Sequence, residues 1–247
     1  MNLPIMNDET LEDLQLNSLR LIQKKNGFRF GMDSVLLAHF AAIKPGDSVV
    51  DFGTGSGVIP LLLIGRNKGI VFDAIEIQEQ YCEMAKRTMC MNNLENRVRI
   101  HCADAGNADQ IIPGNSVDAV VCNPPYGKYG AVLSSPYTDR STARNQKPDT
   151  LKKLFTAAFR ILKGKGKISI VYPASQMLHA MKVLSECHLE PKRFQLVYPQ
   201  VEKPANLVLI EGVKDAKPTL KPMPPLIIYD ENYILTNGLK SIYHIEE

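Results

Sequence analysis

The stretch Asn123-Pro124-Pro125-Tyr126 places an amide, two prolines and an aromatic ring directly after the apolar run VDAVVC. Proline fixes the backbone angle φ and donates no backbone hydrogen bond, so the segment is a stiff turn. The turn would hold an amide and a carbonyl acceptor beside a ring that can stack on a planar group. The alternative is a Pro-Pro turn that only joins a strand to a loop.

A second candidate segment is VVDFGTGSG, in which Gly53, Gly55 and Gly57 follow Asp51 at alternate positions. Glycines let a backbone turn tightly beside a ligand, and the helix after them points its N–H groups at that ligand. Val58 stands where the dinucleotide-binding fingerprint has its third glycine. The pattern resembles the first motif of class I S-adenosylmethionine-dependent methyltransferases. The alternative is a glycine-rich turn that binds nothing.

Two carboxylates lie at the ends of the next two predicted strand segments, Glu76 in GIVFDAIEI and Asp104 in RVRIHCADA. Glu76 is placed to accept hydrogen bonds from both ribose hydroxyls of an adenosyl group. Asp104 is placed to accept from the adenine amino group. NAD and S-adenosylmethionine both contain adenosine, so Glu76 alone does not distinguish them, and surface acids are the alternative for both positions.

The Asn123-to-Tyr126 motif itself resembles the catalytic motif of class I methyltransferases that methylate planar amino or amide nitrogens. The lone pair of such a nitrogen is delocalised, which makes it a poor nucleophile. Hydrogen bonds from its N–H groups to the Asn123 side-chain oxygen and the Pro124 carbonyl would favour a pyramidal nitrogen, with little reorganisation in the transition state. Tyr126 would stack on the target ring.

Alternating strands and helices must position these motifs. The sequence predicts a hairpin over 18–30 with Asn26-Gly27 as its turn, and a helix over 31–43. Repeated strand–helix units then predict an α/β fold, a doubly wound and mostly parallel seven-stranded sheet. The runs RFQLVYPQ and NLVLIEGVK are joined too closely for a helix, so they should form a C-terminal antiparallel hairpin.

Three parts are expected along the chain. Residues 1–43 form an N-terminal hairpin and helix that pack on the cofactor site. Residues 44–213 form the methyltransferase core. Residues 214–247 form an extended, proline-rich tail that packs on that core.

The amino-acid composition excludes several classes of protein. Hydrophobic residues make up 45% of the 247, enough for a substantial core. The five cysteines show no CxxC spacing, which argues against a zinc site and a disulfide framework and fits a reducing cytoplasm. No apolar run is long enough to span a bilayer, and the N-terminus lacks the apolar centre of a signal peptide. We therefore expect a cytoplasmic protein without metal or membrane; the sequence does not indicate an oligomeric state.

Nearly the whole chain resembles the bacterial family of tRNA adenine-N6 methyltransferases, through LIQKKNGFRFGMDSVLLAHF, NPPY and KPANLVLIEG. The resemblance implies S-adenosylmethionine as cofactor and the adenosine just 3′ of the anticodon of a valine tRNA as target. NQKP, after Arg144, and DENYILT near the C-terminus depart from the family pattern, so the exact RNA is not identified. The resemblance implies positions along the cofactor: Phe30 and Asp33 at its methionine half, Asp51, Gly53 and Gly55 at its centre, Glu76 at the ribose and Asp104 at the adenine. It also implies that Asn123 lies beside both cofactor and target base, and that Pro124, Pro125 and Tyr126 lie at the target base.

The charge distribution fits an RNA substrate. From Gly127 to Lys167 the chain holds ten basic and two acidic residues, a net charge of +8 against −5 for the rest. Phosphate contacts supply much of the affinity for nucleic acid, so this segment should flank the mouth of the site. Solvated surface lysines are the alternative. The residues expected to contact RNA are Lys128, Arg140, Arg144, Lys147 and Lys203.

Other functions share some of these features. A guanine-N2 ribosomal RNA methyltransferase and a release-factor glutamine methyltransferase both use NPPY, although the latter family has a longer helical domain before its glycine loop. An RNA-binding module without turnover would keep the fold, but the intact motifs argue against it. A NAD-dependent oxidoreductase is opposed by Val58 and by NPPY.

Overall fold

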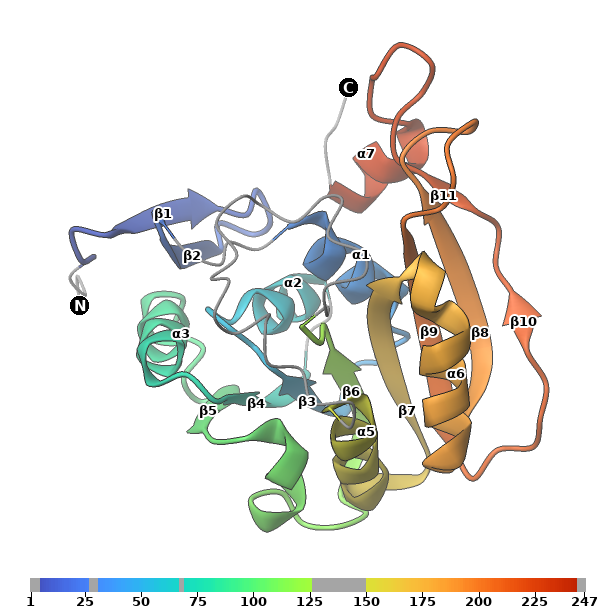
Figure 1. Cartoon of the computed structure of the whole chain (residues 1–247). Coiled ribbons are helices and arrows are strands. Elements are labelled where there is room, and N and C mark those ends of the chain that lie inside the picture. The colour runs from blue at the N-terminus through green and yellow to red at the C-terminus, as the bar shows by residue number, and fades with distance from the viewer. Residues whose placement is uncertain (1–4, 27–30, 67–68, 126–149, 244–247) are drawn as a thin grey trace.

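The computed structural model describes residues 5–26, 31–66, 69–125 and 150–243. The centre of the described part is one large sheet with the strand order β10-β8-β9-β7-β6-β3-β4-β5, and β11 also pairs with β8 (Figure 1). The strands are β3 (Ser48–Phe52), β4 (Val71–Glu76), β5 (Val98–Cys102), β6 (Val117–Cys122), β7 (Leu162–Pro173), β8 (Leu189–Tyr198), β9 (Leu207–Lys214), β10 (Lys221–Pro222) and β11 (Leu226–Ile227).

The strand directions confirm the predicted fold class. Strands β3 to β7 are parallel to one another, and β9 lies antiparallel between β7 and β8. These seven strands are the doubly wound sheet with a C-terminal antiparallel hairpin that the sequence predicts. The tail adds the two short strands β10 and β11, both parallel to the outer edge of β8.

Helices cover both faces of the sheet (Figure 1). One buried cluster joins the first face to α1, α2 and α7, and a second joins the other face to α5 and α6. Side chains of β3 point alternately to the two faces and so contribute to both clusters. Val49 belongs to the first cluster, and Val50 and Phe52 belong to the second. The helices are α1 (Met32–Phe40), α2 (Val58–Arg66), α3 (Glu79–Met91), the 3₁₀ helix η1 (Ala105–Gln110), α5 (Thr150–Ile161), the 3₁₀ helix η2 (Ala174–Gln176), α6 (Met177–Glu186) and α7 (Asn237–Tyr243).

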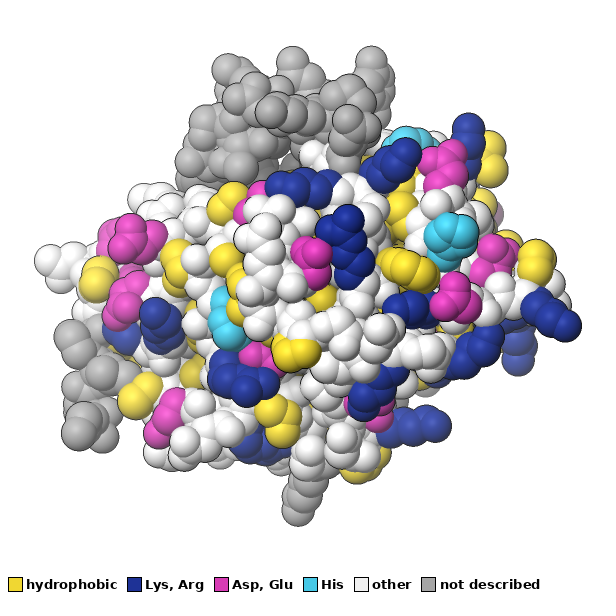
Figure 2. Space-filling view, turned by 90° about the horizontal axis from the view of Figure 1, so that it is seen from below, with side chains coloured by type: hydrophobic (Ala, Val, Ile, Leu, Met, Phe, Trp, Pro, Cys, Tyr) yellow, Lys and Arg dark blue, Asp and Glu magenta, His cyan; other side chains and the backbone are white. Residues whose placement is uncertain are grey.

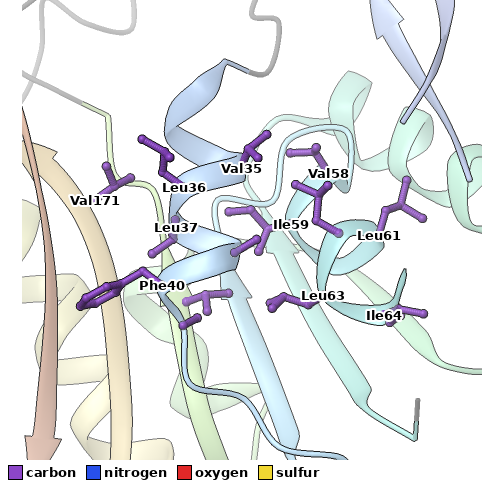
Figure 3. Close-up of a cluster of buried hydrophobic side chains, with 14 of the residues drawn as sticks. Val35, Leu36, Leu37, Phe40, Val58, Ile59, Leu61, Leu63, Ile64 and Val171 are labelled. Atoms are coloured by element: carbon purple, nitrogen blue, oxygen red, sulfur yellow. The ribbon is translucent and has the colours of Figure 1, made fainter. Parts of the chain in front are cut away.

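The first cluster fixes the helix that precedes the glycine loop against the helix that follows it. Leu36 and Leu37 of α1 and Leu61 and Leu63 of α2 are fully or almost fully buried. Figure 3 shows Val35 of α1 and Ile59 of α2 between the two helices, and Leu36 of α1 on the side of that helix that faces Val171 of β7. This packing places the first turn of α1 near the edge of the sheet where the candidate motifs lie.

The N-terminal hairpin differs from the sequence prediction. Strand β2 (Arg20–Lys24) pairs with β1 (Glu9–Asp13), which precedes it, so the hairpin connection lies at residues 14–19. The prediction missed β1, and the expected turn at Asn26-Gly27 extends into residues 27–30, outside the described part. Strand β1 is held by a distant partner, because buried Glu9 accepts two hydrogen bonds from Arg87 of α3, at 2.7 and 2.6 Å.

The tail packs on the core, but it is not extended throughout as predicted. After β11 it makes a turn and ends in α7, whose Leu239 and Ile242 are buried against the first cluster. At the start of the tail, the buried ammonium of Lys214 donates to Asn115 and to the carbonyls of Phe159 and Leu162, at 2.7 to 2.8 Å. Within the described ranges, none of the helices has the length and apolarity needed to cross a membrane.

Candidate active site

The glycine loop joins β3 to α2 at the carboxyl edge of the sheet. Gly53, Gly55 and Gly57 have φ angles of 75°, 56° and 91°, in the left-handed region that side chains other than glycine rarely adopt. The N–H groups of Gly53 and Thr54 bond to the carbonyl of Ile75, at 2.9 and 3.1 Å. A Cβ atom on Gly53 would meet no other atom within 4 Å, so the loop borders open space there.

Glu76, at the end of β4, is bonded to this loop. Its side chain is buried and accepts from the Gly55 N–H at 3.0 Å and from the Gln78 N–H at 2.9 Å. A carboxylate has lone pairs for further donors, so these bonds are compatible with the predicted ribose contact. The carboxylate also shapes the loop, a structural function that the sequence prediction did not include.

Asp51 lies at the same edge, in the last part of β3. Its side chain is fully buried, and neither carboxylate oxygen has a hydrogen-bond partner among the described residues. Burial raises its pKa to about 7; the nearby Thr54 hydroxyl opposes this shift and the Glu76 carboxylate adds to it. The Thr54 hydroxyl does not meet hydrogen-bond geometry and also has no partner in the described part. Unsatisfied buried oxygens are uncommon, and here they fit a ligand that brings donors and positive charge.

Asp104 follows β5, next to Glu76. The N–H of Ala103 bonds to the carbonyl of Glu76 at 2.9 Å, which joins the ends of the two strands. The Asp104 carboxylate accepts from the Gly106 N–H at 2.8 Å and caps η1. It also pairs with the Lys153 ammonium of α5 at 2.6 Å, a partner that the sequence prediction did not include.

Asn123 follows β6, the strand that pairs with β3 on the side opposite β4. Its side-chain nitrogen donates to the hydroxyl of Ser34 in the first turn of α1, at 3.4 Å. Pro124 is buried and Pro125 is exposed, whereas Tyr126 lies outside the described residues. The edge of the sheet therefore brings Asn123 together with Asp51, although 72 positions separate them in the chain.

Ser34 is a residue of this site that sequence reasoning missed. It sits beside the predicted Asp33, and its side chain is buried. A serine in the first turn of an apolar helix carries no sequence signal for this contact, because the partner lies 89 positions away. Asp33 is partly exposed in the same turn, and Phe30 lies outside the described residues.

The predicted RNA contacts are only partly described. Lys203 is exposed in the connection between β8 and β9, at the same edge of the sheet as Asn123. The expectation that the whole basic segment flanks the mouth is wrong, because Lys163 and Lys165 lie at the start of β7, at the opposite edge. Lys163 pairs there with Asp118 at 2.7 Å. The other predicted contacts, Lys128, Arg140, Arg144 and Lys147, lie outside the described residues.

Figure 2 shows the molecule from that opposite side, where basic and acidic side chains are interspersed. A cavity of about 320 Å³, lined by Asp73, Arg99 and His101 among others, lies away from the glycine loop. The Asp73 carboxylate accepts two hydrogen bonds from Arg99, at 2.8 and 2.6 Å, and contacts His101 at 2.7 Å. These polar groups satisfy one another, so we do not assign the cavity to the candidate site.

Comparisons with known proteins show which proteins this chain resembles. The sequence pattern of the methyltransferase small domain family matches residues 30–193. A protein of Parabacteroides distasonis, named tRNA1(Val) (adenine(37)-N6)-methyltransferase, is 29% identical over 84% of this chain and 85% of its own length. A Flavobacterium psychrophilum protein with the same name is 30% identical over 68% and 71%.

Solved structures show the same fold. A predicted O-methyltransferase from Agrobacterium tumefaciens has a TM-score of 0.70 at 17% identity, covering 86% of this chain and 96% of its own. An S-adenosylmethionine-dependent O-methyltransferase from Thermotoga maritima has a TM-score of 0.53 at 21% identity, covering 79% and 69%.

Proposed function

The chain belongs to the methyltransferase small domain family, and from this premise we propose that it transfers a methyl group from S-adenosylmethionine to the N6 amino group of an adenine in tRNA. The observation that carries the proposal is the placement of Asn123-Pro124-Pro125 at the same sheet edge as the glycine loop. One motif would hold the target amine and the other the methyl donor. The names of the Parabacteroides and Flavobacterium relatives support tRNA and adenine-N6 as the target.

The residues at this edge fit the donor. S-adenosylmethionine supplies a methyl group bound to a positively charged sulfur. The buried oxygens of Asp51 and Thr54, which lack partners in the described part, would accept from the ligand. Gly53 and Gly55 would line the centre of the donor, and the loop borders open space at Gly53. Glu76 would face the ribose and Asp104 the adenine amino group. Phe30 and Asp33 complete the methionine end, as the family resemblance implies.

The target amine would be held by acceptors that do not move. The two N–H groups of the amine donate to the Asn123 side-chain oxygen and to the Pro124 carbonyl. These contacts favour a pyramidal nitrogen, so its lone pair is directed at the methyl group. Because Pro124 and Pro125 restrict the backbone, the acceptors need little reorganisation as positive charge develops on the nitrogen. The ring of Tyr126 stacks on the adenine. A strong general base is not needed, since the amine becomes acidic only after it is alkylated.

Substrate identity is tested by offering the protein radiolabelled S-adenosylmethionine with total tRNA, ribosomal RNA and a protein extract, each separately. We expect label in N6-methyladenosine recovered from tRNA. Label only in N2-methylguanosine of ribosomal RNA, or only in protein, would replace this proposal with a guanine-N2 or a glutamine methyltransferase. No transfer to any substrate, with RNA still bound, would favour a binding module.

The Asn123→Ala variant tests the site in the same assay. The hydrogen bonds from Asn123 matter most in the transition state, so kcat should fall far more than the affinity for S-adenosylhomocysteine. A single-turnover rate equal to that of the unchanged protein would show that Asn123 has no such role.

A further inference from the structure

Lys153 occupies an unusual position for a lysine. It lies in the first turn of α5, which begins at Thr150. Positive charge at a helix N-terminus opposes the helix dipole, so Lys153 does not stabilise its own helix. Its ammonium instead reaches the Asp104 carboxylate at 2.6 Å, across 49 positions of sequence. The two side chains are about half and one-third exposed, and exposed ion pairs of this kind contribute little to folding stability.

The path of the Lys153 side chain depends on Gly106. A Cβ atom on Gly106 would lie 2.6 Å from Cδ and Cε of Lys153 and 2.7 Å from Cγ. These atoms form the middle of the side chain, so a methyl group there would displace the ammonium from Asp104. The absence of a side chain at Gly106 therefore leaves the space through which Lys153 reaches the carboxylate.

Both oxygens of Asp104 are consequently fixed. One accepts from the Gly106 N–H at 2.8 Å and the other from Lys153. Burial alone would raise the pKa of Asp104, but the hydrogen bonds from Lys153 and Gly106 outweigh it and hold the pKa below its usual value. The carboxylate is thus ionised and oriented, and its remaining lone pairs can accept another donor.

We propose that Lys153 is a positioning residue for the methyl donor: it holds Asp104 as the acceptor for the adenine amino group and so contributes to adenine selectivity. The proposal rests on the proposed function, in which Asp104 faces the adenine. Because α5 begins directly after residues 126–149, the lysine also joins the adenine end of the site to the helix that follows this segment.

The test measures the affinity of two ligands by calorimetry: S-adenosylhomocysteine and S-inosylhomocysteine, whose purine carries an oxo group in place of the amino group. The ionised Asp104 should favour the amino ligand. Lys153→Met keeps the length of the side chain and removes its charge. We expect it to weaken S-adenosylhomocysteine binding about 5- to 10-fold, the size of one ordinary hydrogen bond, because Asp104 remains but is less well oriented, with a smaller effect on the inosyl ligand. Selectivity between the two should therefore fall.

Three further variants distinguish positioning from a structural effect. Lys153→Arg should restore most of the selectivity. Gly106→Ala should lower it as Lys153→Met does, and combining these two changes should add little, because both remove the same contact. The matched control is Lys152→Met, an exposed lysine of the same helical turn, which should bind like the unchanged protein. In turnover assays, Lys153→Met should raise KM for S-adenosylmethionine with kcat nearly unchanged.

Two results would overturn the proposal. The first is a selectivity in Lys153→Met equal to that of Lys152→Met, which would refute the role of Lys153 and leave the methyltransferase assignment intact. The second is a failure of the unchanged protein to bind S-adenosylhomocysteine, which would refute the proposed function and this inference together.

Discussion

The side-chain nitrogen of Asn123 donates to the hydroxyl of Ser34, with 3.4 Å between the two atoms. The contact joins the end of β6 to the first turn of α1 and determines which end of the amide faces the helix. Ser34 is buried, and α1 is fixed by its packing on α2 (Figure 3). The orientation of the proposed catalytic amide therefore depends on a helix that lies before the glycine loop in the sequence.

We predict that Ser34→Ala lowers kcat about 2- to 10-fold, the effect of one ordinary hydrogen bond, with little change in KM for S-adenosylmethionine. Steady-state methylation of tRNA measures both constants. Ser116→Ala is the control, because the Ser116 hydroxyl also takes part in one hydrogen bond, here as the donor to the Pro113 carbonyl, but lies at the opposite edge of the sheet. Equal kcat values for the two variants would show that Ser34 does not orient Asn123.

Asp51 should make the stability of the ligand-free protein depend on pH. Burial raises its pKa to about 7, from 3.8 for an exposed aspartate. Between these values the folded protein keeps a proton that the unfolded chain has lost, so the group lowers stability increasingly as pH rises through this window. Asp51→Asn removes the effect. Its stability advantage over the unchanged protein should grow by on the order of 2–3 kcal/mol between pH 5 and pH 8.

Urea unfolding at the two pH values, without ligand, measures this difference. The same variant should bind S-adenosylhomocysteine more weakly, because an amide in place of the Asp51 carboxylate offers the ligand no negative charge. Stability curves that remain parallel from pH 5 to pH 8 would contradict the raised pKa of Asp51.

Local sequence patterns were sufficient to predict the βα core and the edge at which the motifs meet. Parallel strands end at a common edge, so Asp51, Glu76, Asp104 and Asn123 could be assigned to it from their positions near or after the ends of predicted strands. The prediction of the methyltransferase family and fold is confirmed by the comparisons. The roles assigned to individual side chains remain predictions, because they depend on ligands.

Contacts between distant segments could not be predicted in this way. Strand β1 lies in an acidic stretch and is held partly by Arg87, 78 positions away. Ser34 and Lys153 likewise meet their partners only in the folded chain. The prediction for the basic segment was wrong for a related reason. Helix α5 runs from one edge of the sheet to the other, so Lys163 lies at the edge opposite Asn123. The net charge of a sequence segment does not show at which edge of the sheet its charged residues lie.

The Arg87–Glu9 pair should be important for stability. The two side chains are 8% and 1% exposed, and the guanidinium forms two hydrogen bonds to the carboxylate. Arg87→Met should lower the free energy of unfolding by about 3 kcal/mol, because it leaves a buried carboxylate without its partner. The double variant Glu9→Gln/Arg87→Met should lose less than the single one. Thermal and urea unfolding measure the stability of the single and the double variant.

The stabilisation by the Arg87–Glu9 pair should decrease at low pH. Hydrogen bonding to Arg87 holds the pKa of Glu9 below its usual 4.5, so the pair stabilises the protein above that pH and the stabilisation is lost as pH falls through the lowered pKa. Lys182→Met serves as control, since it removes an exposed pair with Glu186 whose atoms are 4.0 Å apart. If the two single variants were equally stable at pH 7, the buried pair would not have the importance assigned here.

The two edges of the sheet should differ in their contribution to RNA binding. If the substrate is tRNA, neutralising its phosphates releases counterions, and the logarithm of affinity should fall linearly with the logarithm of salt concentration. Replacing Arg140, Arg144 and Lys147 with alanine should flatten this slope by roughly 0.7 to 0.9 for each phosphate that is no longer neutralised, with S-adenosylhomocysteine affinity nearly unchanged. Filter binding of tRNA at a series of salt concentrations measures the slope.

The control for this prediction is a second triple variant, Lys163→Ala/Lys165→Ala/Lys217→Ala, which removes the same charge from exposed positions at the edge opposite Asn123. Its slope should stay close to that of the unchanged protein, because an RNA whose adenine reaches Asn123 approaches from the other edge. Equal flattening by both triple variants would mean that net charge alone attracts the RNA, and the placement of the RNA at the Asn123 edge would then have to be abandoned.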